Sequence, residues 1–136
     1  MTITQTVYEE MLASALKHKP IEACALLGGK GDAVTYFFEM TNADAAEEHF
    51  SLIPEEQFAA VKKFRELGLT MLGIWHSHPA SPARMSEEDL RLAYTADAAY
   101  VILSLQNEGK PVLKSFNVNE GVSSEMELKV IGCDDE

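Results

Sequence analysis

The sequence predicts an α/β (α+β) fold in which helices pack on one mixed β-sheet. Segments with helical periodicity alternate with short apolar runs along most of the chain, so helices and strands are expected to share one core. Residues 98–105 (AAYVILSL) are almost entirely apolar, which is typical of a central strand covered on both faces. Residues 111–118 and 123–131 alternate between apolar and polar side chains and predict two further strands.

Length, composition and charge narrow the range of functions. Residues 1–136 are expected to form a single domain, of which residues 132–136 are a frayed tail. The formal charge of −11 predicts no binding to nucleic acid or anionic membranes, because both require Lys and Arg. No apolar run reaches the ~18 residues of a membrane span, and the N-terminus lacks the pattern of a signal peptide. Cys24 and Cys133 form no zinc-binding spacing, and a reducing, cytoplasmic location is expected.

The N-terminal part predicts a strand, a helix and a hairpin. Residues 2–4 are expected to form a short strand, and residues 5–19 a helix that Pro20 ends. The apolar face of this helix consists of Val7, Met11, Leu12, Ala15 and Leu16. Residues 24–28 and 33–40 are expected to pair as a hairpin across the turn at residues 29–32.

The middle of the chain predicts a loop, a second helix and a buried strand. Residues 41–48 are polar and without periodicity, and a short strand is expected over residues 49–53. A helix over residues 54–67 begins with proline and ends before a glycine. Its expected core-facing residues are Phe58, Val61, Phe64 and Leu67. The apolar residues 69–75 then predict a buried strand that gives out at the first of two histidines.

These histidines, His76 and His78, stand at the end of the predicted strand. Alternate residues of a strand point to the same side, so both imidazoles can face one point. Neutral imidazole is the commonest metal ligand in proteins. Trp75 precedes the pair, points to the opposite side on this alternation and is expected in the core. Ser77 is expected to support the fold or the site.

The segment after the histidines predicts the start of a third helix. Ser86 suits the N-cap position, and acidic residues fill the first turn. An apolar face is expected from Leu90, Ala93 and Tyr94. Asp89 has two possible roles. It could complete a capping arrangement with Ser86, or it could join the histidines as a third ligand, because two His, one carboxylate and a water form the ligand set of a catalytic zinc site.

The whole pattern resembles the JAMM motif of the MPN-plus zinc metalloproteases. His76-Ser77-His78-Pro79, six further residues, Ser86, two residues and Asp89 match that motif, including the length of the spacer. The family also has a glutamate where the first helix gives way to a strand, and Glu22 occupies the matching place. Ala25 stands where the family usually has glycine, which puts no functional group in doubt. The resemblance covers about residues 3–105 and implies the MPN fold, a cytidine-deaminase-like arrangement.

The resemblance also implies an activity. One Zn²⁺ per chain would be held by His76, His78 and Asp89. Glu22 would take a proton from the attacking water and pass it to the leaving amine, and Ser86 would donate to the oxyanion, cap its helix, or do both. Family members hydrolyse peptide or isopeptide bonds at the C-terminus of ubiquitin-like proteins, and small prokaryotic members are linked to sulfur carriers. The chain has no room for the long inserts with which larger relatives grip ubiquitin chains, so a ubiquitin-like or sulfur-carrier protein is the expected partner.

Two functions of other classes stay open: a non-catalytic MPN module that binds a partner, and a zinc hydrolase of a small non-protein amide. The oligomeric state is open as well. His49 could line the substrate groove or be an exposed strand residue, and Arg84 could meet a substrate carboxylate or be solvated. A role of Cys133 as a further metal contact is not expected, because nothing fixes the tail near the site.

Overall fold

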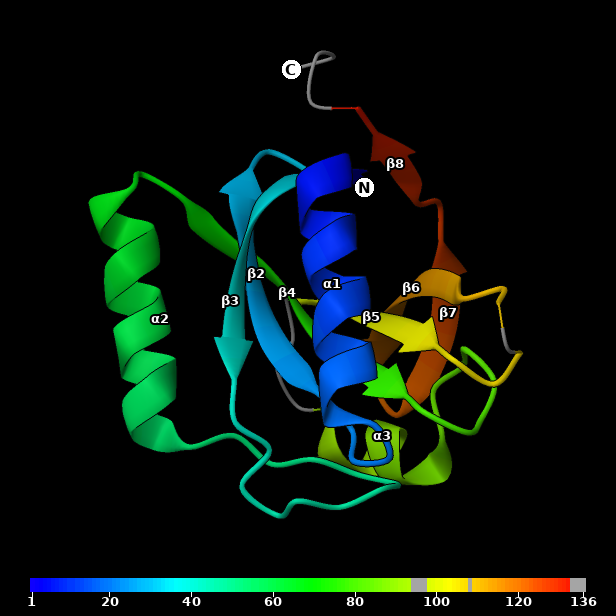
Figure 1. Cartoon of the computed structure of the whole chain (residues 1–136). Coiled ribbons are helices and arrows are strands. Elements are labelled where there is room, and N and C mark those ends of the chain that lie inside the picture. The colour runs from blue at the N-terminus through cyan, green and yellow to red at the C-terminus, as the bar shows by residue number, and fades with distance from the viewer. Residues whose placement is uncertain (94–97, 108, 133–136) are drawn as a thin grey trace.

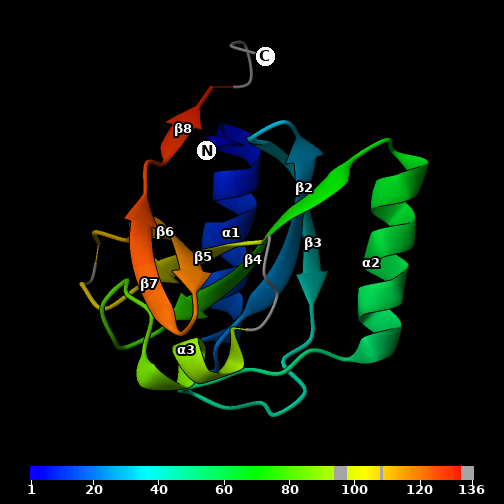
Figure 2. The same ribbon diagram turned by 180° about the vertical axis from the view of Figure 1, so that it is seen from behind.

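The computed structural model of the chain describes residues 1–93, 98–107 and 109–132. The elements follow one another in this order: β1 (Thr2–Thr4), α1 (Gln5–His18), β2 (Cys24–Lys30), β3 (Ala33–Met40), α2 (Pro54–Glu66), β4 (Thr70–His78), α3 (Glu87–Leu92), β5 (Ala99–Ser104), β6 (Val112–Asn119), β7 (Val122–Met126) and β8 (Lys129–Ile131). The strands form one mixed sheet in the order β7-β6-β5-β4-β2-β3-β1-β8. Figures 1 and 2 show this sheet and its helices from opposite sides.

The sheet is strongly curled. Strands β7 and β8 stand at opposite ends of the strand order, although only residues 127 and 128 separate them in the sequence. The two edges must therefore lie near each other, and Figure 1 shows β8 continuing upward from β7. The prediction of one strand over residues 123–131 is wrong here, because the chain leaves one edge at Met126 and joins β1 at the other edge from Lys129 onward.

Strand β4 lies in the middle of the sheet and divides the core into two layers. It pairs antiparallel with β2 and parallel with β5. Ile74 packs with the core residues of α2, whereas Trp75 packs with α1, which crosses in front of the sheet in Figure 1. Trp75 is fully buried and β5 is buried along its whole length, as predicted for both.

Helix α1 forms where the sequence predicts it. Thr4 caps it by accepting a hydrogen bond from the backbone N–H of Val7 at 3.2 Å. The buried stripe of this helix follows a spacing of four residues through Val7, Met11 and Ala15. Leu16 falls outside that stripe and is 55% exposed, so its predicted core position is wrong.

Helix α2 buries a narrower face than predicted. Three of the four expected core residues are exposed, namely Phe58, Val61 and Leu67. The four predicted residues follow one another at intervals of three, and each such step shifts the side chain by about 60° around the helix. The buried residues Ala60 and Phe64 are four apart and so lie on nearly the same side of the helix. Phe64 meets the rings of Tyr36 and Phe38 edge-on, with centroids 5.9 and 6.3 Å away. The sheet therefore contacts α2 along a single line of side chains.

The predicted strand over residues 49–53 is absent, and this stretch continues the loop that begins at Thr41. A backbone hydrogen bond closes the loop on itself, because Ala43 N–H donates to the carbonyl oxygen of Ser51 at 2.9 Å. Glu56 ties the loop to α2, since its carboxylate accepts hydrogen bonds from the N–H and the hydroxyl of Thr41, both at 2.7 Å. The loop is thus anchored at its start by a side chain of the following helix.

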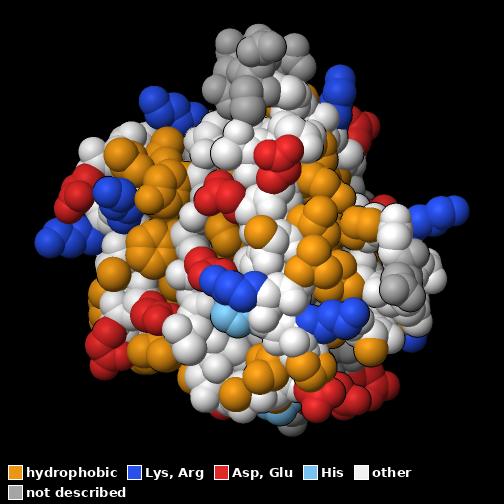
Figure 3. Space-filling model, viewed as in Figure 1, with side chains coloured by type: hydrophobic (Ala, Val, Ile, Leu, Met, Phe, Trp, Pro, Cys, Tyr) orange, Lys and Arg blue, Asp and Glu red, His pale blue; other side chains and the backbone are white. Residues whose placement is uncertain are grey.

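Some predictions concern residues outside the described part of the chain, namely Tyr94 and residues 133–136 of the tail, including Cys133. Leu90 and Ala93 of the predicted third helical face are half-buried against the core, as expected. Within the described residues, no helix has the length and apolar character needed to cross a membrane. On the face shown in Figure 3, Lys and Arg side chains lie between acidic ones and form no continuous basic patch.

Gly29 gives a test of the β2–β3 pairing. It lies at an irregularity in the register of β2, and a Cβ at this position would overlap the backbone carbonyl oxygen of Ala33. Because a backbone atom cannot turn aside, we expect Gly29→Ala to lower the free energy of unfolding by about 3 kcal/mol. Lys30→Ala, at the exposed neighbouring position, should change it by less than about 0.5 kcal/mol. Urea unfolding measures both, and equal midpoints would contradict this register.

Candidate metal centre

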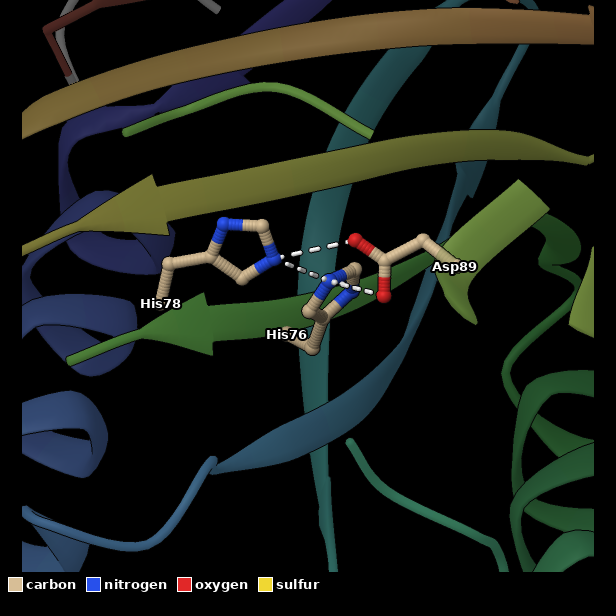
Figure 4. Close-up of side chains that lie close together, drawn as sticks. All are labelled: His76, His78 and Asp89. Carbon is tan, nitrogen blue, oxygen red and sulfur yellow. Dashed lines mark hydrogen bonds and ion pairs between the residues drawn. The ribbon is translucent and has the colours of Figure 1, made fainter. Parts of the chain in front are cut away.

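Three buried side chains converge at one end of the sheet. His76 and His78 project from the end of β4, and Asp89 projects toward them from the first turn of α3 (Figure 4). The two Nε2 atoms lie 3.1 Å apart. Carboxylate oxygens of Asp89 lie 3.0 Å from Nε2 of His78 and 3.3 Å from Nε2 of His76. The structure therefore brings together the three side chains proposed from the sequence as metal ligands.

The geometry of these donors fits zinc. Ligand bonds of about 2.0–2.1 Å put the corners of a zinc tetrahedron about 3.3 Å apart, and the three observed separations lie between 3.0 and 3.3 Å. A carboxylate and two neutral imidazoles all offer lone pairs, so their burial around one point is favourable only with a shared cation or proton. Among the described residues, this is the one group of His, Cys, Asp and Glu side chains that could hold a metal ion.

His78 is oriented by the loop that follows β4. Its Nδ1 lies 2.8 Å from the carbonyl oxygen of Pro82. A carbonyl can only accept, so Nδ1 carries the proton and Nε2 keeps its lone pair for a metal. Burial lowers the pKa of His78, but the hydrogen bonds with Asp89 and Pro82 outweigh burial and raise it overall. A proton can therefore take the place of the cation at this ring when no metal is bound.

His76 is held by packing. Its Nδ1 is buried and has no hydrogen-bond partner among the described residues. The ring of Phe50 covers the imidazole instead, with centroids 4.8 Å apart and an interplanar angle of 31°. Burial lowers the pKa of His76, which keeps the ring neutral, as a ligand must be.

Asp89 caps its helix and at the same time faces the two histidines, so the two roles that the sequence left open do not exclude each other. Its Oδ2 accepts a hydrogen bond from the N–H of Ser86 at 3.0 Å, and Ser86 Oγ accepts one from the N–H of Asp89 at 3.0 Å. This reciprocal cap fixes the carboxylate on the first turn of α3 while it faces the histidines. Burial raises the pKa of Asp89, but hydrogen bonds from His76 and His78 outweigh it and hold the pKa well below its usual range.

Ser86 can cap its helix and still donate. Its oxygen accepts the hydrogen bond from Asp89 N–H, and no acceptor for its own proton occurs in the described part of the structure. A hydroxyl has two lone pairs and one proton, so capping uses only a lone pair. The two roles considered for Ser86 are compatible in this rotamer.

Glu22 reaches the site through the pairing of β2 with β4. In this antiparallel pair Cys24 lies opposite His76, so Glu22, two residues before Cys24, comes beside His78, two residues after His76. Glu22 Oε2 lies 4.0 Å from His78 Nε2. The side chain is only 2% exposed, and its Oε1 has no hydrogen-bond partner among the described residues. Burial raises the pKa of Glu22 to about 8.

Ser77 fastens this segment from the other face of β4. Its hydroxyl oxygen accepts a hydrogen bond from Ala23 N–H at 2.8 Å, and its N–H donates to Ala23 O at 3.0 Å. The residue next to Glu22 is thereby tied to the residue between the two histidines. Ser77 was expected to support either the fold or the site. Its two hydrogen bonds to Ala23 join β4 to the segment before β2, next to the candidate site residues.

The remaining candidates lie around the site. His49 is half-exposed, and its Nε2 lies 3.3 Å from a carboxylate oxygen of Asp44. Arg84 is exposed and borders a groove of about 400 Å³. The other residues around this groove are His78, Ser81, Pro82, Met85, Ser86 and Glu87. Sequence reasoning gave Phe50 no part in the site, because an isolated aromatic residue in a loop carries no sign of the ring it will contact.

Glu22 should make the stability of the metal-free protein depend on pH. The unfolded chain loses this proton near the ordinary pKa of 4.5, whereas the folded protein keeps it up to about pH 8. Between these values the folded state binds more protons than the unfolded state, so the free energy of unfolding falls as pH rises. Glu22→Gln lacks this contribution.

Urea unfolding of both metal-free proteins from about pH 5 to about pH 8 tests this dependence. As the pH rises, the free energy of unfolding of wild type should fall relative to that of Glu22→Gln by a few kcal/mol, since one pKa unit corresponds to about 1.4 kcal/mol. A difference that stays constant with pH would mean that Glu22 is not buried in this way.

Phe50→Ala should weaken zinc binding. Without the ring, His76 can rotate because its Nδ1 has no partner to hold it, and loss of a ligand-orienting contact typically costs about 10–100-fold in metal affinity. Competition with a zinc-binding dye measures the Kd. Phe58→Ala removes the same ring from the exposed side of α2 and is the matched control. Equal Kd values for the two variants would show that Phe50 does not orient His76.

Comparisons with known proteins identify relatives of this chain. The sequence profile of the family described as prokaryotic homologs of the JAB domain matches residues 4–118. The chain is 29% identical over 133 residues to a CysO-cysteine peptidase of Mycobacterium tuberculosis, covering 96% of this chain and 91% of that protein. It is 26% identical over 103 residues to a desampylase of Pyrococcus furiosus, covering 76% and 74% of the two chains.

Solved structures share the fold. A protein of Desulfitobacterium hafniense is 45% identical, with a TM-score of 0.90 over 96% of this chain and 92% of that one. A JAB1/MPN domain protein of Archaeoglobus fulgidus is 26% identical, with a TM-score of 0.65 over 96% and 99%. A structure described as a JAMM metalloprotease-like zinc site in the proteasome and signalosome is 25% identical, with a TM-score of 0.62 over 96% and 97%. The predicted MPN fold is confirmed, and the chain belongs to the prokaryotic homologs of the JAB domain, the small prokaryotic members of the JAMM/MPN family.

Proposed function

We propose that the chain is a zinc-dependent peptidase or isopeptidase that hydrolyses an amide bond at the C-terminus of a ubiquitin-like or sulfur-carrier protein. Hydrolysis of peptide or isopeptide bonds follows from the relatives named CysO-cysteine peptidase and desampylase. The substrate class and the roles of individual residues are the proposal. The observation that carries it is the buried carboxylate of Glu22, with one oxygen unpartnered, beside the cluster of His76, His78 and Asp89.

Each residue has a defined part in this reaction. His76, His78 and Asp89 would hold Zn²⁺, which when bound supplies a Lewis acid and a water of lowered pKa. Glu22 accepts a proton from the attacking water and returns it to the leaving amine, a task that suits a buried carboxylate with one unpartnered oxygen among the described residues, 4.0 Å from His78 Nε2. Ser86 donates its free hydroxyl proton to the carbonyl oxygen as negative charge develops there.

The surface beside the cluster suits an extended substrate. His78 and Ser86, two of the five proposed site residues, border the groove of about 400 Å³ that also meets Arg84. An open groove can take a protein tail lying across it, whereas a small ligand is usually enclosed by its pocket over most of its surface. This favours a carrier tail over a small non-protein amide.

Metal analysis and carrier cleavage test the proposal together. Wild type should contain about one zinc per chain, and His76→Ala should lose it. Mass spectrometry should show that zinc-loaded wild type shortens a carrier that bears an added C-terminal residue or conjugate. Glu22→Gln, which keeps the ligands, should be slower by about 10²–10⁴-fold, and Ser86→Ala by about 10²–10³-fold.

Each contrary result would favour a different function. Zinc binding without cleavage of any carrier would reject this substrate class and favour a hydrolase of a small amide. If the chain binds no zinc even when the metal is added, a partner-binding role without catalysis becomes the better explanation.

A further inference from the structure

Asn42 is the hydrogen-bonding centre of the loop that follows β3. Its Nδ2 donates to the carbonyl oxygens of Glu22 (3.0 Å), His49 (3.0 Å) and Ala46 (3.4 Å). Its Oδ1 accepts from the N–H groups of Asp44 at 3.1 Å and Ser51 at 3.3 Å. One half-buried side chain therefore joins both ends of the loop and connects the loop to Glu22.

The loop holds both backbone groups of Glu22. The N–H of Glu22 donates to the carbonyl oxygen of Ala46 at 2.9 Å, and its carbonyl oxygen accepts from Asn42 Nδ2. Asn42 also contacts the Ala46 carbonyl, which is the acceptor for that N–H. Glu22 precedes the first residue of β2, so these bonds replace the strand ladder that holds the residues after it.

A buried carboxylate needs such a hold. Glu22 is 2% exposed and its Oε1 has no hydrogen-bond partner among the described residues. Burying a charge or an unsatisfied polar oxygen costs free energy. If hydrogen bonds did not fix the backbone of Glu22, its side chain would therefore turn toward water. Ser77 fixes the following residue, Ala23, from the other side. The direction of the Glu22 side chain is thus set between Ser77 and Asn42.

We propose that Asn42 is a positioning residue that keeps the carboxylate of Glu22 beside the metal cluster. The inference rests on the proposed function, in which Glu22 carries the proton. Among the described residues, no hydrogen bond joins Asn42 to His76, His78 or Asp89, and Asn42 does not border the groove beside them, so its link to the reaction is through Glu22 and the loop.

Amide hydrogen exchange, measured by NMR on the zinc-loaded protein, tests without any substrate whether Asn42 fixes the backbone of Glu22. In Asn42→Ala the N–H of Glu22 should exchange at least about 10-fold faster than in wild type, because its acceptor moves with the loop. The N–H of Ala23, bound to Ser77, should keep its protection. Thr41→Ala is the matched control: it removes one hydrogen bond of the same loop, to Glu56, and should leave both amides protected.

Unchanged protection of Glu22 in Asn42→Ala would overturn the proposal. Asn42→Asp serves as a second variant if Asn42→Ala does not fold. It keeps the size of the side chain and the acceptor Oδ1, but it sets an oxygen against three carbonyl oxygens. It should release the Glu22 amide in the same way.

Kinetics with saturating zinc test the consequence. For carrier hydrolysis, Asn42→Ala should lower kcat by about 10–100-fold with KM changed by less than about 2-fold, since a misplaced base loses transition-state stabilisation. In a Glu22→Gln background the same substitution should cost nothing further. Two outcomes would reject the positioning role. One is an equal loss of kcat in both backgrounds, and the other is an unchanged kcat in Asn42→Ala although its Glu22 amide exchanges faster. If wild type cuts no carrier, the proposed function fails and the exchange data alone decide the inference.

Discussion

The burial of three lone-pair donors around one point is the constraint on which the rest of the structure depends. His76, His78 and Asp89 hold their donor atoms 3.0–3.3 Å apart in the interior, where charge without compensation is unfavourable. A scaffold that allowed any of them to turn toward water would lose the cluster. The histidines therefore stand on the central strand β4, paired on both sides, and Asp89 stands on a capped helical turn.

Several groups serve folding and the site at the same time. The carboxylate of Asp89 completes the cap of α3 and faces both histidines, and the hydroxyl of Ser86 accepts in the same cap, which leaves its proton without an acceptor among the described residues. The carbonyl of Pro82 satisfies the ring of His78 and so selects its tautomer. Such double use means that a substitution here changes local stability and the proposed chemistry together, which is why matched variants elsewhere in the same elements matter.

Glu22 shows how the sheet brings distant segments of the chain together at the candidate site. It comes from the chain before β2, yet the antiparallel pairing with β4 sets it beside His78. In the metal-free protein burial raises the pKa of its carboxyl group to about 8, and the loop after β3 holds its backbone by hydrogen bonds. The same loop carries Phe50 onto the ring of His76. One loop of irregular structure thus contacts both the proposed base and a proposed ligand.

The sequence by itself determined what depends on short-range geometry. The spacing of His76 and His78 places both rings on one side of a strand, and the spacing of Ser86 and Asp89 defines a helical cap, because strand and helix geometry repeat over a few residues. Glu22 was found through family resemblance, since one glutamate carries no local signal of its own. Only the tertiary structure decided the contacts of Asn42 and Phe50, the narrow buried face of α2 and the break between β7 and β8. Each of these depends on which distant segments meet when the sheet curls, and no pattern of neighbouring residues records that.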